Sequence, residues 1–355
     1  MRMKIKRTEE LKVKLYDDNG YISISNILAK GYPFNFITGG RGTGKTYTAL
    51  KYAVENRIKF ILLRRTQQQC DIINTPEFNI FRPLNAGEGW NIGSKKISKQ
   101  NAVFYRMQEV DGKEVPSGEP LGYTAALSTL SNMRGFDASD VGLLIYDEFC
   151  PERHERLIKH EAEAFFNAVE TINRNRELSG KPPITCLCLA NSNDLANPIY
   201  VSLGILSTID KMRSKCREVY ENRERGLLVI SLKNSPISER KSKTALYRLT
   251  EGSDFAGMAI NNDYVADVPS TIRHVPLAEC RPMVTADKIT IYRHKSNRHL
   301  YVSTHKTGVC PVYGPDETSV KRFRQAWGWI WAEYLRNNII FEDYAAEIML
   351  TKYLA

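Results

Sequence analysis

The sequence lacks long apolar runs, and it lacks the spacings of cysteine or histidine that hold metal ions. No stretch approaches the ~20 uncharged apolar residues of a membrane-spanning helix, and residues 1–20 are charged throughout, without the apolar core of a signal peptide. The seven cysteines include no C-x-x-C pair, and the six histidines show no zinc-ligand spacing. We therefore expect reduced, buried thiols in a cytoplasm, no structural metal and no membrane partner.

Positive charge is in moderate excess. Hydrophobic residues make up 42% of the 355 residues and charged residues 25%, which are ordinary values for a folded protein and argue against disorder. The formal net charge is +10. Lysine and arginine gain free energy when they displace counterions from nucleic acid, so this charge is compatible with a polyanionic partner but does not identify one.

A glycine-rich loop between an apolar run and a helical pattern carries the most specific signal. The segment GGRGTGKT satisfies the G-x-x-x-x-G-K-[ST] pattern, with a strand predicted before it and a helix after it. Loop amides and the positive end of the helix would surround the phosphates of ATP, the lysine would add a mobile cation, and the threonine hydroxyl would bind Mg²⁺. The predicted nucleotide-binding residues are Gly39, Gly40, Arg41, Gly42, Thr43, Gly44, Lys45 and Thr46.

Two consecutive acids end a second apolar run, LLIYDE. Asp147 can hold the Mg²⁺ ion, and Glu148 can orient or deprotonate the water that attacks the γ-phosphate. This second acid favours an NTP hydrolase that drives movement over a nucleotide kinase. A GTPase is disfavoured because no D-x-x-G pattern follows, and because Ser192 replaces the lysine of a guanine-reading N-K-x-D motif.

Three further side chains suit an oligomeric motor, and each has a simpler alternative. Asn191 follows the apolar run CLCLA, where its amide could sense the γ-phosphate or merely form a strand-end turn. Arg174 and Arg176 lie near the carboxyl end of a helix predicted over residues 161–178, where arginines can simply interact with the helix dipole. Alternatively, one of them reaches the ATP of a neighbouring subunit as an arginine finger.

Continuous apolar runs alternate with helical patterns as far as about residue 200. Strands are predicted at 32–37, 59–65, 141–149 and 182–194, and glycine- and lysine-rich hairpin loops are expected to project from the core between about 81 and 122. The runs are continuous rather than alternating, which indicates a sheet covered on both faces. The fold class predicted is α/β, with a doubly wound, mostly parallel sheet that binds ligands at the carboxyl ends of its strands.

The character of the sequence changes after residue 197. We expect an ATPase domain at 1–230 with a lid at about 198–230, then an exposed linker at 231–262. A smaller α+β domain is predicted at 263–355, with strands near 288–294 and 299–304 and a closing helix from Val320.

The motifs GGRGTGKT, ILLRR, MRGF, LLIYDEF, INRNRE and CLCLANS occur in this order over residues 30–200. This series resembles the DNA-packaging ATPases of small tailed bacteriophages, the phi29-like group, which are distant relatives of large terminase subunits. The resemblance implies an ASCE-type P-loop NTPase that forms a ring, pentameric in that family. Such a ring docks on the portal of an empty capsid in the host bacterial cytoplasm and pulls double-stranded DNA inward with ATP. A scaffold RNA is a further partner that the resemblance allows.

The same resemblance suggests roles for individual residues. The catalytic set that it implies is Lys45, Glu148, Asn191 for coupling and Arg174 acting in trans, with Mg²⁺ held by Thr46 and Asp147. Arg41 would contact the γ-phosphate in cis, and Arg134 would face either the pore or the adjacent nucleotide. Where relatives can carry a DNA-facing lysine this chain has Gln67, and the weaker candidates for DNA contact are Lys95 and Lys96.

In large terminases the carboxyl-terminal domain is a ribonuclease H-like nuclease with clustered carboxylates. Here no strand pattern presents such a cluster, so the resemblance suggests a nuclease-derived fold that has lost cleavage. Two alternatives to an ATP-driven translocase stay open at this point. One is a packaging terminase with an active carboxyl-terminal endonuclease, and the other is a non-catalytic assembly adaptor regulated by nucleotide.

Overall fold

The computed structural model describes residues 14–98, 101–129, 138–151, 155, 158, 160–191, 197–233, 235–253, 256–257, 259, 272–296 and 299–354. The chain forms two compact units, residues 1–193 with 218–265 and residues 194–217 with 266–355. Among the described residues, no helix is both long enough and apolar enough to cross a membrane. All seven cysteines are free thiols.

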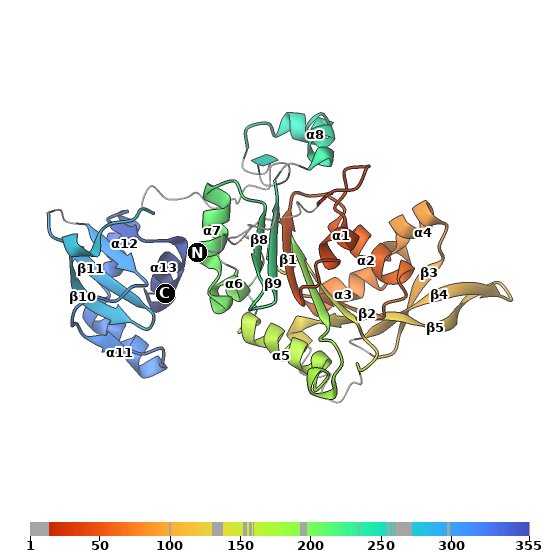
Figure 1. Cartoon of the computed structure of the whole chain (residues 1–355), viewed down its shortest axis with the longest axis horizontal. Coiled ribbons are helices and arrows are strands. Elements are labelled where there is room, and N and C mark those ends of the chain that lie inside the picture. The colour runs from red at the N-terminus through yellow and green to blue at the C-terminus, as the bar shows by residue number, and fades with distance from the viewer. Residues whose placement is uncertain are drawn as a thin grey trace, which may run out of the picture. The chain divides into compact units, whose positions relative to one another are not determined.

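Within its described residues, the first unit contains a nine-stranded sheet in the order β3-β4-β5-β2-β6-β7-β1-β9-β8 (Figure 1). The strands are β1 (Phe34–Gly39), β2 (Phe60–Arg64), β3 (Ile92–Lys96), β4 (Ala102–Val110), β5 (Lys113–Ala126), β6 (Leu143–Asp147), β7 (Thr185–Ala190), β8 (Val219–Asn222) and β9 (Leu227–Leu232). The six strands from β5 to β9 in this order pair in parallel, and β3, β4 and β8 add antiparallel edges.

Helices cover both faces of this sheet. They are α1 (Ile24–Leu28), α2 (Lys45–Glu55), α3 (Gln67–Ile73), α4 (Arg82–Glu88) and α5 (Glu161–Asn173). The short helices α8 (Pro236–Ser242) and α9 (Ala245–Leu249) follow β9 in the chain, and α8 lies beyond the end of that strand (Figure 1). Alternate residues of each central strand point to opposite faces. Ile37 of β1 packs in a core cluster with α1, α2 and α4, whereas the ring of Phe36 lies 5.6 Å from Phe149 and 6.5 Å from Phe165 of α5. The predicted two-sided burial is confirmed.

The strand order determines which side chains can meet. β7 lies between β1 and β6, and β2 lies on the other side of β6, with all neighbouring pairs parallel. The carboxyl ends of these four strands therefore lie at one edge of the sheet. Three of them are followed by a segment that the sequence singled out, namely the glycine loop after β1, Glu148 after β6 and Asn191 after β7. The ligand site of a doubly wound sheet is expected at this edge.

Residues 81–122 are not merely projecting loops, which corrects the prediction. They form α4, the edge strands β3 and β4 and most of β5, and β5 pairs in parallel with β2. Only the end of the β4–β5 hairpin extends beyond the sheet (Figure 1). Gly112, Lys113 and Gly118 lie in the exposed half of this ribbon, and the other glycines and lysines that suggested loops lie mostly in α4 and β3. Thr124, Ala125 and Ala126 at the base of the ribbon are buried.

The unit boundaries also differ from the predicted ones at 230 and 262. β8 and β9 complete the sheet of the first unit, and residues 233–244, expected as part of a bare linker, contain α8. Residues 198–217, expected as part of a lid, instead belong to the second unit. The reason is that α7 (Leu206–Ser214) packs against α13 (Tyr344–Leu354).

The second unit is a smaller α+β domain, as predicted. In its described part a five-stranded sheet has the order β13-β10-β11-β12-β14. Its elements are α6 (Pro198–Leu203), α7, β10 (Cys280–Ala286), β11 (Ile289–His294), β12 (Leu300–Ser303), β13 (Val312–Tyr313), α11 (Glu317–Trp327), α12 (Ile330–Leu335), β14 (Ile339–Phe341) and α13. The ribonuclease H-like character of this domain stays a prediction.

The prediction of a single closing helix from Val320 is wrong in detail. The helical pattern is split at Gly328 into α11 and α12. Phe323 and Ile330 are buried in the core of the unit, whereas Trp331 is 38% exposed. A helical repeat in the sequence cannot detect such an interruption when apolar residues continue across it.

Candidate nucleotide-binding site

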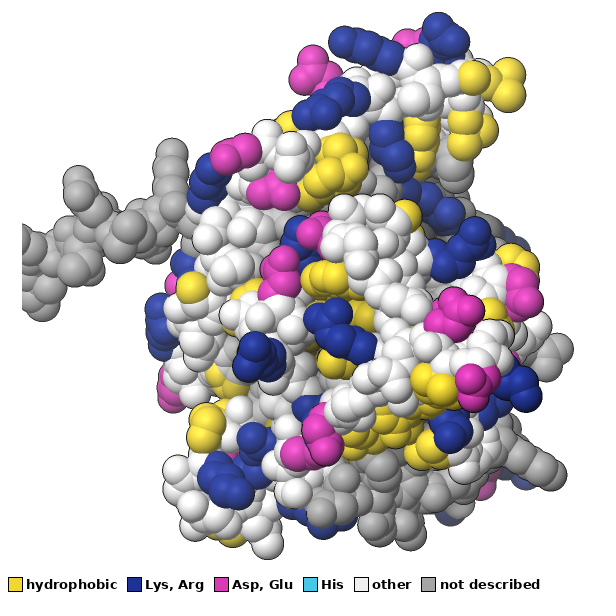
Figure 2. Space-filling model, turned by 90° about the vertical axis from the view of Figure 1, so that its right-hand side faces the viewer, with side chains coloured by type: hydrophobic (Ala, Val, Ile, Leu, Met, Phe, Trp, Pro, Cys, Tyr) yellow, Lys and Arg dark blue, Asp and Glu magenta, His cyan; other side chains and the backbone are white. Residues whose placement is uncertain are grey.

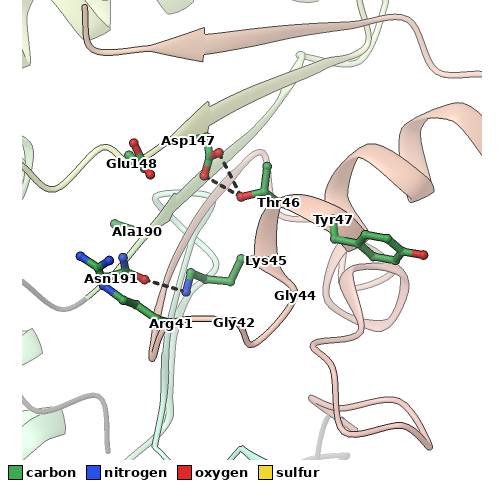
Figure 3. Close-up of a pocket in the computed structure, with 10 residues that line it drawn as sticks. All are labelled: Arg41, Gly42, Gly44, Lys45, Thr46, Tyr47, Asp147, Glu148, Ala190 and Asn191. Atoms are coloured by element: carbon green, nitrogen blue, oxygen red, sulfur yellow. Dashed lines mark hydrogen bonds between the residues drawn. The ribbon is translucent and has the colours of Figure 1, made fainter. Parts of the chain in front are cut away.

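The glycine loop connects the end of β1 to the start of α2. Gly42 and Gly44 have φ angles of +75° and +83°, in the left-handed region that a residue without a Cβ adopts at little cost. A Cβ added to Gly44 would lie 2.8 Å from the ring of Tyr21. The loop is thus held in a conformation that depends on these glycines. It leaves the amino-terminal end of α2 facing a pocket of about 360 Å³ (Figure 3), which suits an anion.

Lys45 is buried at the centre of this loop. Its Nζ donates to the carbonyl oxygens of Gly39 and Gly40, both at 2.9 Å, and to Oδ1 of Asn191 at 3.2 Å. Burial lowers the pKa of Lys45 to about 8, an effect that the nearby Asp147 carboxylate opposes. The ammonium group is therefore confined to the place where a phosphate would enter the loop, with carbonyl and amide oxygens as its acceptors.

Thr46 and Asp147 face each other across the pocket. The Thr46 hydroxyl lies 3.0 Å from each carboxylate oxygen of Asp147, and Figure 3 shows the two side chains pointing toward one another. A hydroxyl and a carboxylate are the hard oxygen ligands that Mg²⁺ takes when substrate phosphates and water complete its shell. The residues present therefore fit a magnesium ion bound together with a nucleotide.

Glu148 lies immediately after β6, with φ of +58° and a side chain that is 53% exposed. Its carboxylate accepts from Arg64 at 2.7 Å, and the same guanidinium lies 3.0 Å from Asp147. Both acids of the pocket thus share one arginine, which lies in the motif ILLRR but for which no role was predicted. The available signal was its position at the end of a continuous apolar run that becomes a strand beside β6.

The pocket thus gathers the loop residues and three predicted side chains from other strands. Asn191, which follows β7, reaches Lys45 because β7 lies between β1 and β6. The lining residues are Arg41, Gly42, Gly44, Lys45, Thr46, Tyr47, Asp147, Glu148, Ala190 and Asn191. In Figure 3 the ring of Tyr47 points away from the acids. The catalytic roles of Lys45, Glu148 and Asn191 stay predictions.

The two candidate finger arginines differ in their surroundings. Arg176 donates to the carbonyl oxygens of Val141 and Pro182, within its own unit. Arg174 is exposed and ends α5 with φ of +45° and ψ of −134°. Arg174 is the more exposed of the two, and which of them acts as an arginine finger stays a prediction.

The described residues predicted to contact DNA lie outside the pocket lining, and two of them, Gln67 and Lys96, are neighbours because both contact Asp71. Lys95 and Lys96 are exposed on β3, and Lys96 lies 3.7 Å from Asp71. The amide group of Gln67 donates to Asp71 at 3.3 Å. The face of the first unit in Figure 2 carries basic and acidic side chains interspersed. Arg134 lies outside the described residues.

Comparison with known proteins identifies relatives. The family described as Podovirus DNA encapsidation protein (Gp16) matches residues 16–276. A DNA packaging protein of Bacillus phage B103 is 27% identical over 238 residues, 66% of this chain and 64% of that protein. The DNA packaging protein of Bacillus phage phi29 is 24% identical over 262 residues, 72% of this chain and 68% of that protein. The chain thus matches just under two thirds of the length of the B103 relative.

Two solved structures share the fold across nearly the whole chain. The phage phi29 viral genome packaging motor assembly matches with a TM-score of 0.66 and 18% identity, covering 94% of this chain and 99% of that one. The phi28 gp11 DNA packaging motor matches with a TM-score of 0.62 and 19% identity, covering 95% and 98%. With the family match over residues 16–276, these findings confirm the predicted resemblance: the chain belongs to the Podovirus DNA encapsidation protein (Gp16) family.

Proposed function

We propose that this protein is an ATP-driven translocase that packages double-stranded viral DNA into a preformed capsid, working as a ring on the portal. One observation carries the proposal. The phosphate loop, the acids after β6 and Asn191 after β7 meet in a single pocket, in a chain of the DNA encapsidation family. The pocket contains the groups that ATP hydrolysis needs, and membership of the family indicates that the substrate is DNA.

The residues of the pocket would divide the work of hydrolysis. Lys45 and the loop amides would bind the β- and γ-phosphates, and Thr46 and Asp147 would hold Mg²⁺, which neutralises charge on the phosphate oxygens. Glu148 is accessible enough to orient a water molecule, provided that it leaves Arg64. Asn191, bonded to Lys45, would change partner when the γ-phosphate is lost and so report hydrolysis to β7.

Arg174 would complete the site of an adjacent subunit. It is exposed at the end of α5, and a guanidinium supplied in trans can stabilise the charge that develops on the γ-phosphate. This requirement explains why a ring is needed for turnover. The expected setting is the host cytoplasm, with the ring docked transiently on the procapsid. Ring size, pentameric in the resemblance, and a scaffold RNA belong to the same proposal.

The deciding experiment measures ATPase activity and DNA packaging with portal-bearing capsids, Mg²⁺ and double-stranded DNA. Glu148→Gln should reduce turnover by ~10²- to 10⁴-fold, the usual contribution of a general base, while ATP binding persists. Glu170→Gln, which removes an exposed carboxylate from α5, is the matched control and should remain active. Intact ATPase activity and packaging in Glu148→Gln would instead support the non-catalytic adaptor.

A further inference from the structure

The segment that follows β9 is attached to the phosphate loop through the turn at residues 17–22. Ser235, just before α8, donates to the carbonyl oxygen of Gly20 at 3.3 Å, and Arg240 donates to that of Asn19 at 3.1 Å. The same turn is bonded to the loop, because the amide of Ile22 donates to the carbonyl of Thr43 at 3.0 Å. The position of α8 is therefore fixed relative to the loop.

Lys241 extends from α8 directly to the loop. Its Nζ donates to the carbonyl oxygen of Arg41 at 2.6 Å. A Cβ added to Gly42 would lie only 2.5 Å from that same nitrogen, so the ammonium is in contact with the backbone of the loop. The side chain is half-buried, and its ammonium lies 5.6 Å from the ring centroid of Tyr247 on α9. These contacts hold one conformation of a long side chain.

Both backbone polar groups of Arg41 form hydrogen bonds with this segment. Its carbonyl accepts from Lys241, and its amide donates to the carbonyl of Ala259 at 3.0 Å. Lys241 and Ala259 thus contact the part of the loop farthest from both β1 and α2. Neither the phosphate-loop pattern nor the acidic motif includes any residue of this segment.

We infer that Lys241 is a further nucleotide-binding residue, whose ammonium contacts the terminal phosphates of ATP and thereby ties α8 to the bound nucleotide. The inference deepens the proposed function and rests on it. A lysine ammonium has three donors on a flexible stem, so it can keep its bond to Arg41 and add one to a phosphate oxygen, or exchange one for the other. A charged acceptor gives the stronger hydrogen bond.

Charge favours this contact. Lys45, Arg41 and Lys241 are three cations around one short loop, and Lys241 and Arg41 both oppose the charge on Lys45. A triphosphate would relieve this mutual repulsion. Arg64 already neutralises much of the charge of the two acids, which leaves the loop cations in excess. The segment that carries Lys241 would then respond to whether nucleotide is bound.

The first test uses the unmodified full chain. An acetylating reagent specific for amines is applied with and without Mg²⁺ and a non-hydrolysable ATP analogue, and the modified lysines are quantified by mass spectrometry. The analogue should protect Lys241 several-fold, whereas the exposed Lys243 one residue beyond α8 should react equally in both samples. Equal modification of Lys241 with and without the analogue would overturn the inference.

The second test compares variants that remove or keep the positive charge at position 241. Lys241→Gln should weaken binding of the same analogue about tenfold or more, the effect of losing one charge-assisted hydrogen bond. Lys241→Arg should recover most of the affinity because it restores the cation, and Lys243→Gln should bind as the original chain does. Melting temperatures without nucleotide identify a variant that is merely misfolded, in which case the acetylation result decides.

The outcomes separate this inference from the proposed function. If the original chain fails to bind the Mg²⁺–analogue complex, then the proposed ATPase is itself contradicted. If the original chain binds the analogue, loses binding with Lys45→Ala, and shows neither protection nor weakening at Lys241, then only the role of Lys241 is contradicted. Equal losses in Lys241→Gln and Lys241→Arg would also contradict it, because a purely structural contact would depend on the shape of lysine rather than on its charge.

Discussion

Two consecutive arginines at the end of β2 belong to charge networks of different kinds. Arg64 pairs with Asp147 and with Glu148, whose side chain is 53% exposed to the pocket. Arg65 pairs with Glu161 of α5 at 2.7 Å, and both of these side chains are at most 1% exposed. The hydroxyl of Tyr146 also donates to Glu161, at 3.1 Å. Arg65 also pairs with Glu155, which is 29% exposed. Glu148 of the first network can exchange Arg64 for water or a ligand, whereas the Arg65–Glu161 pair at the centre of the second is closed to water.

This difference teaches that residue type alone does not distinguish a functional ion pair from a structural one. Successive residues of a strand point to opposite faces, so adjacent arginines enter separate environments. A buried pair resists the loss of either partner, because the remaining charge stays unsolvated. A pair with an exposed partner can open at little cost. We call the Arg64 network open and the Arg65 network closed. The predictions below test whether changes in the open network mainly affect activity and whether changes in the closed network mainly affect stability.

The largest effect is expected at Arg174, which belongs to neither network. Arg174→Ala should reduce steady-state ATP turnover by ~10³- to 10⁵-fold, the contribution of an arginine finger, while nucleotide binding survives. Mixing this variant with Lys45→Ala subunits should restore part of the activity, because each supplies at one interface what the other lacks. Absence of recovery in a mixture that still assembles would contradict action between subunits.

The closed network should dominate stability. Arg65→Ala leaves the carboxylate of Glu161 buried without its cation, so we expect a loss of about 3–5 kcal/mol in the free energy of unfolding. Urea denaturation of the full chain measures it. Arg322→Ala removes an exposed arginine from α11 and serves as the control, with an expected change within about 0.5 kcal/mol. A similar small change for Arg65→Ala would abolish the distinction between the networks.

The open network should affect activity more than stability. Arg64→Ala removes the shared cation of Asp147 and Glu148, which alters how both acids are oriented, and turnover should fall about 10- to 100-fold. The melting temperature should change less than in Arg65→Ala. Water can solvate the exposed Glu148, and the buried Asp147 keeps the hydrogen bond from Thr46 and the nearby charge of Lys45. Steady-state ATPase assays and thermal melts on the same samples provide both values. A greater loss of stability at Arg64 than at Arg65 would reverse the assignment.

The smallest effect is expected from charges that belong to no network of this kind. Lys95→Gln combined with Lys96→Gln on β3 should reduce the dependence of DNA affinity on salt by about 0.9 in slope for each DNA phosphate that these lysines neutralise. Binding to double-stranded DNA is measured over a range of salt concentrations. An unchanged slope would show that these exposed lysines neutralise no DNA phosphate.

The sequence allowed the pocket to be predicted where its signals are local. Glycines at left-handed positions, a lysine and threonine at the start of α2, and acids directly after an apolar run each occupy a few consecutive residues. Parallel strands then bring those segments to one edge of the sheet. The strand order, with β7 between β1 and β6, was not predicted, because pairing between distant strands leaves no local signal.

The remaining features depend on pairing between distant segments, which a local pattern cannot show. Arg64 contacts the two acids of the pocket because β2 pairs with β6, and Lys241 reaches the loop because α8 packs on the turn near Gly20. The sequence KNSPISERKSKT favours a linker by composition, yet its contacts with that turn hold it in place. The base of β5 was missed because its neighbours in sequence are polar and glycine-rich, while its partner strand β2 is distant in the chain.

The turn at residues 17–22 precedes every strand of the sheet, yet it forms a wall of the phosphate loop through Tyr21 and Ile22. Recombinant fragments trimmed to start at β1 would therefore lose the support behind Gly44 and the anchoring point of α8 together. Affinity tags or fluorophores intended to leave nucleotide binding intact are better placed well before residue 14 than inserted near this turn.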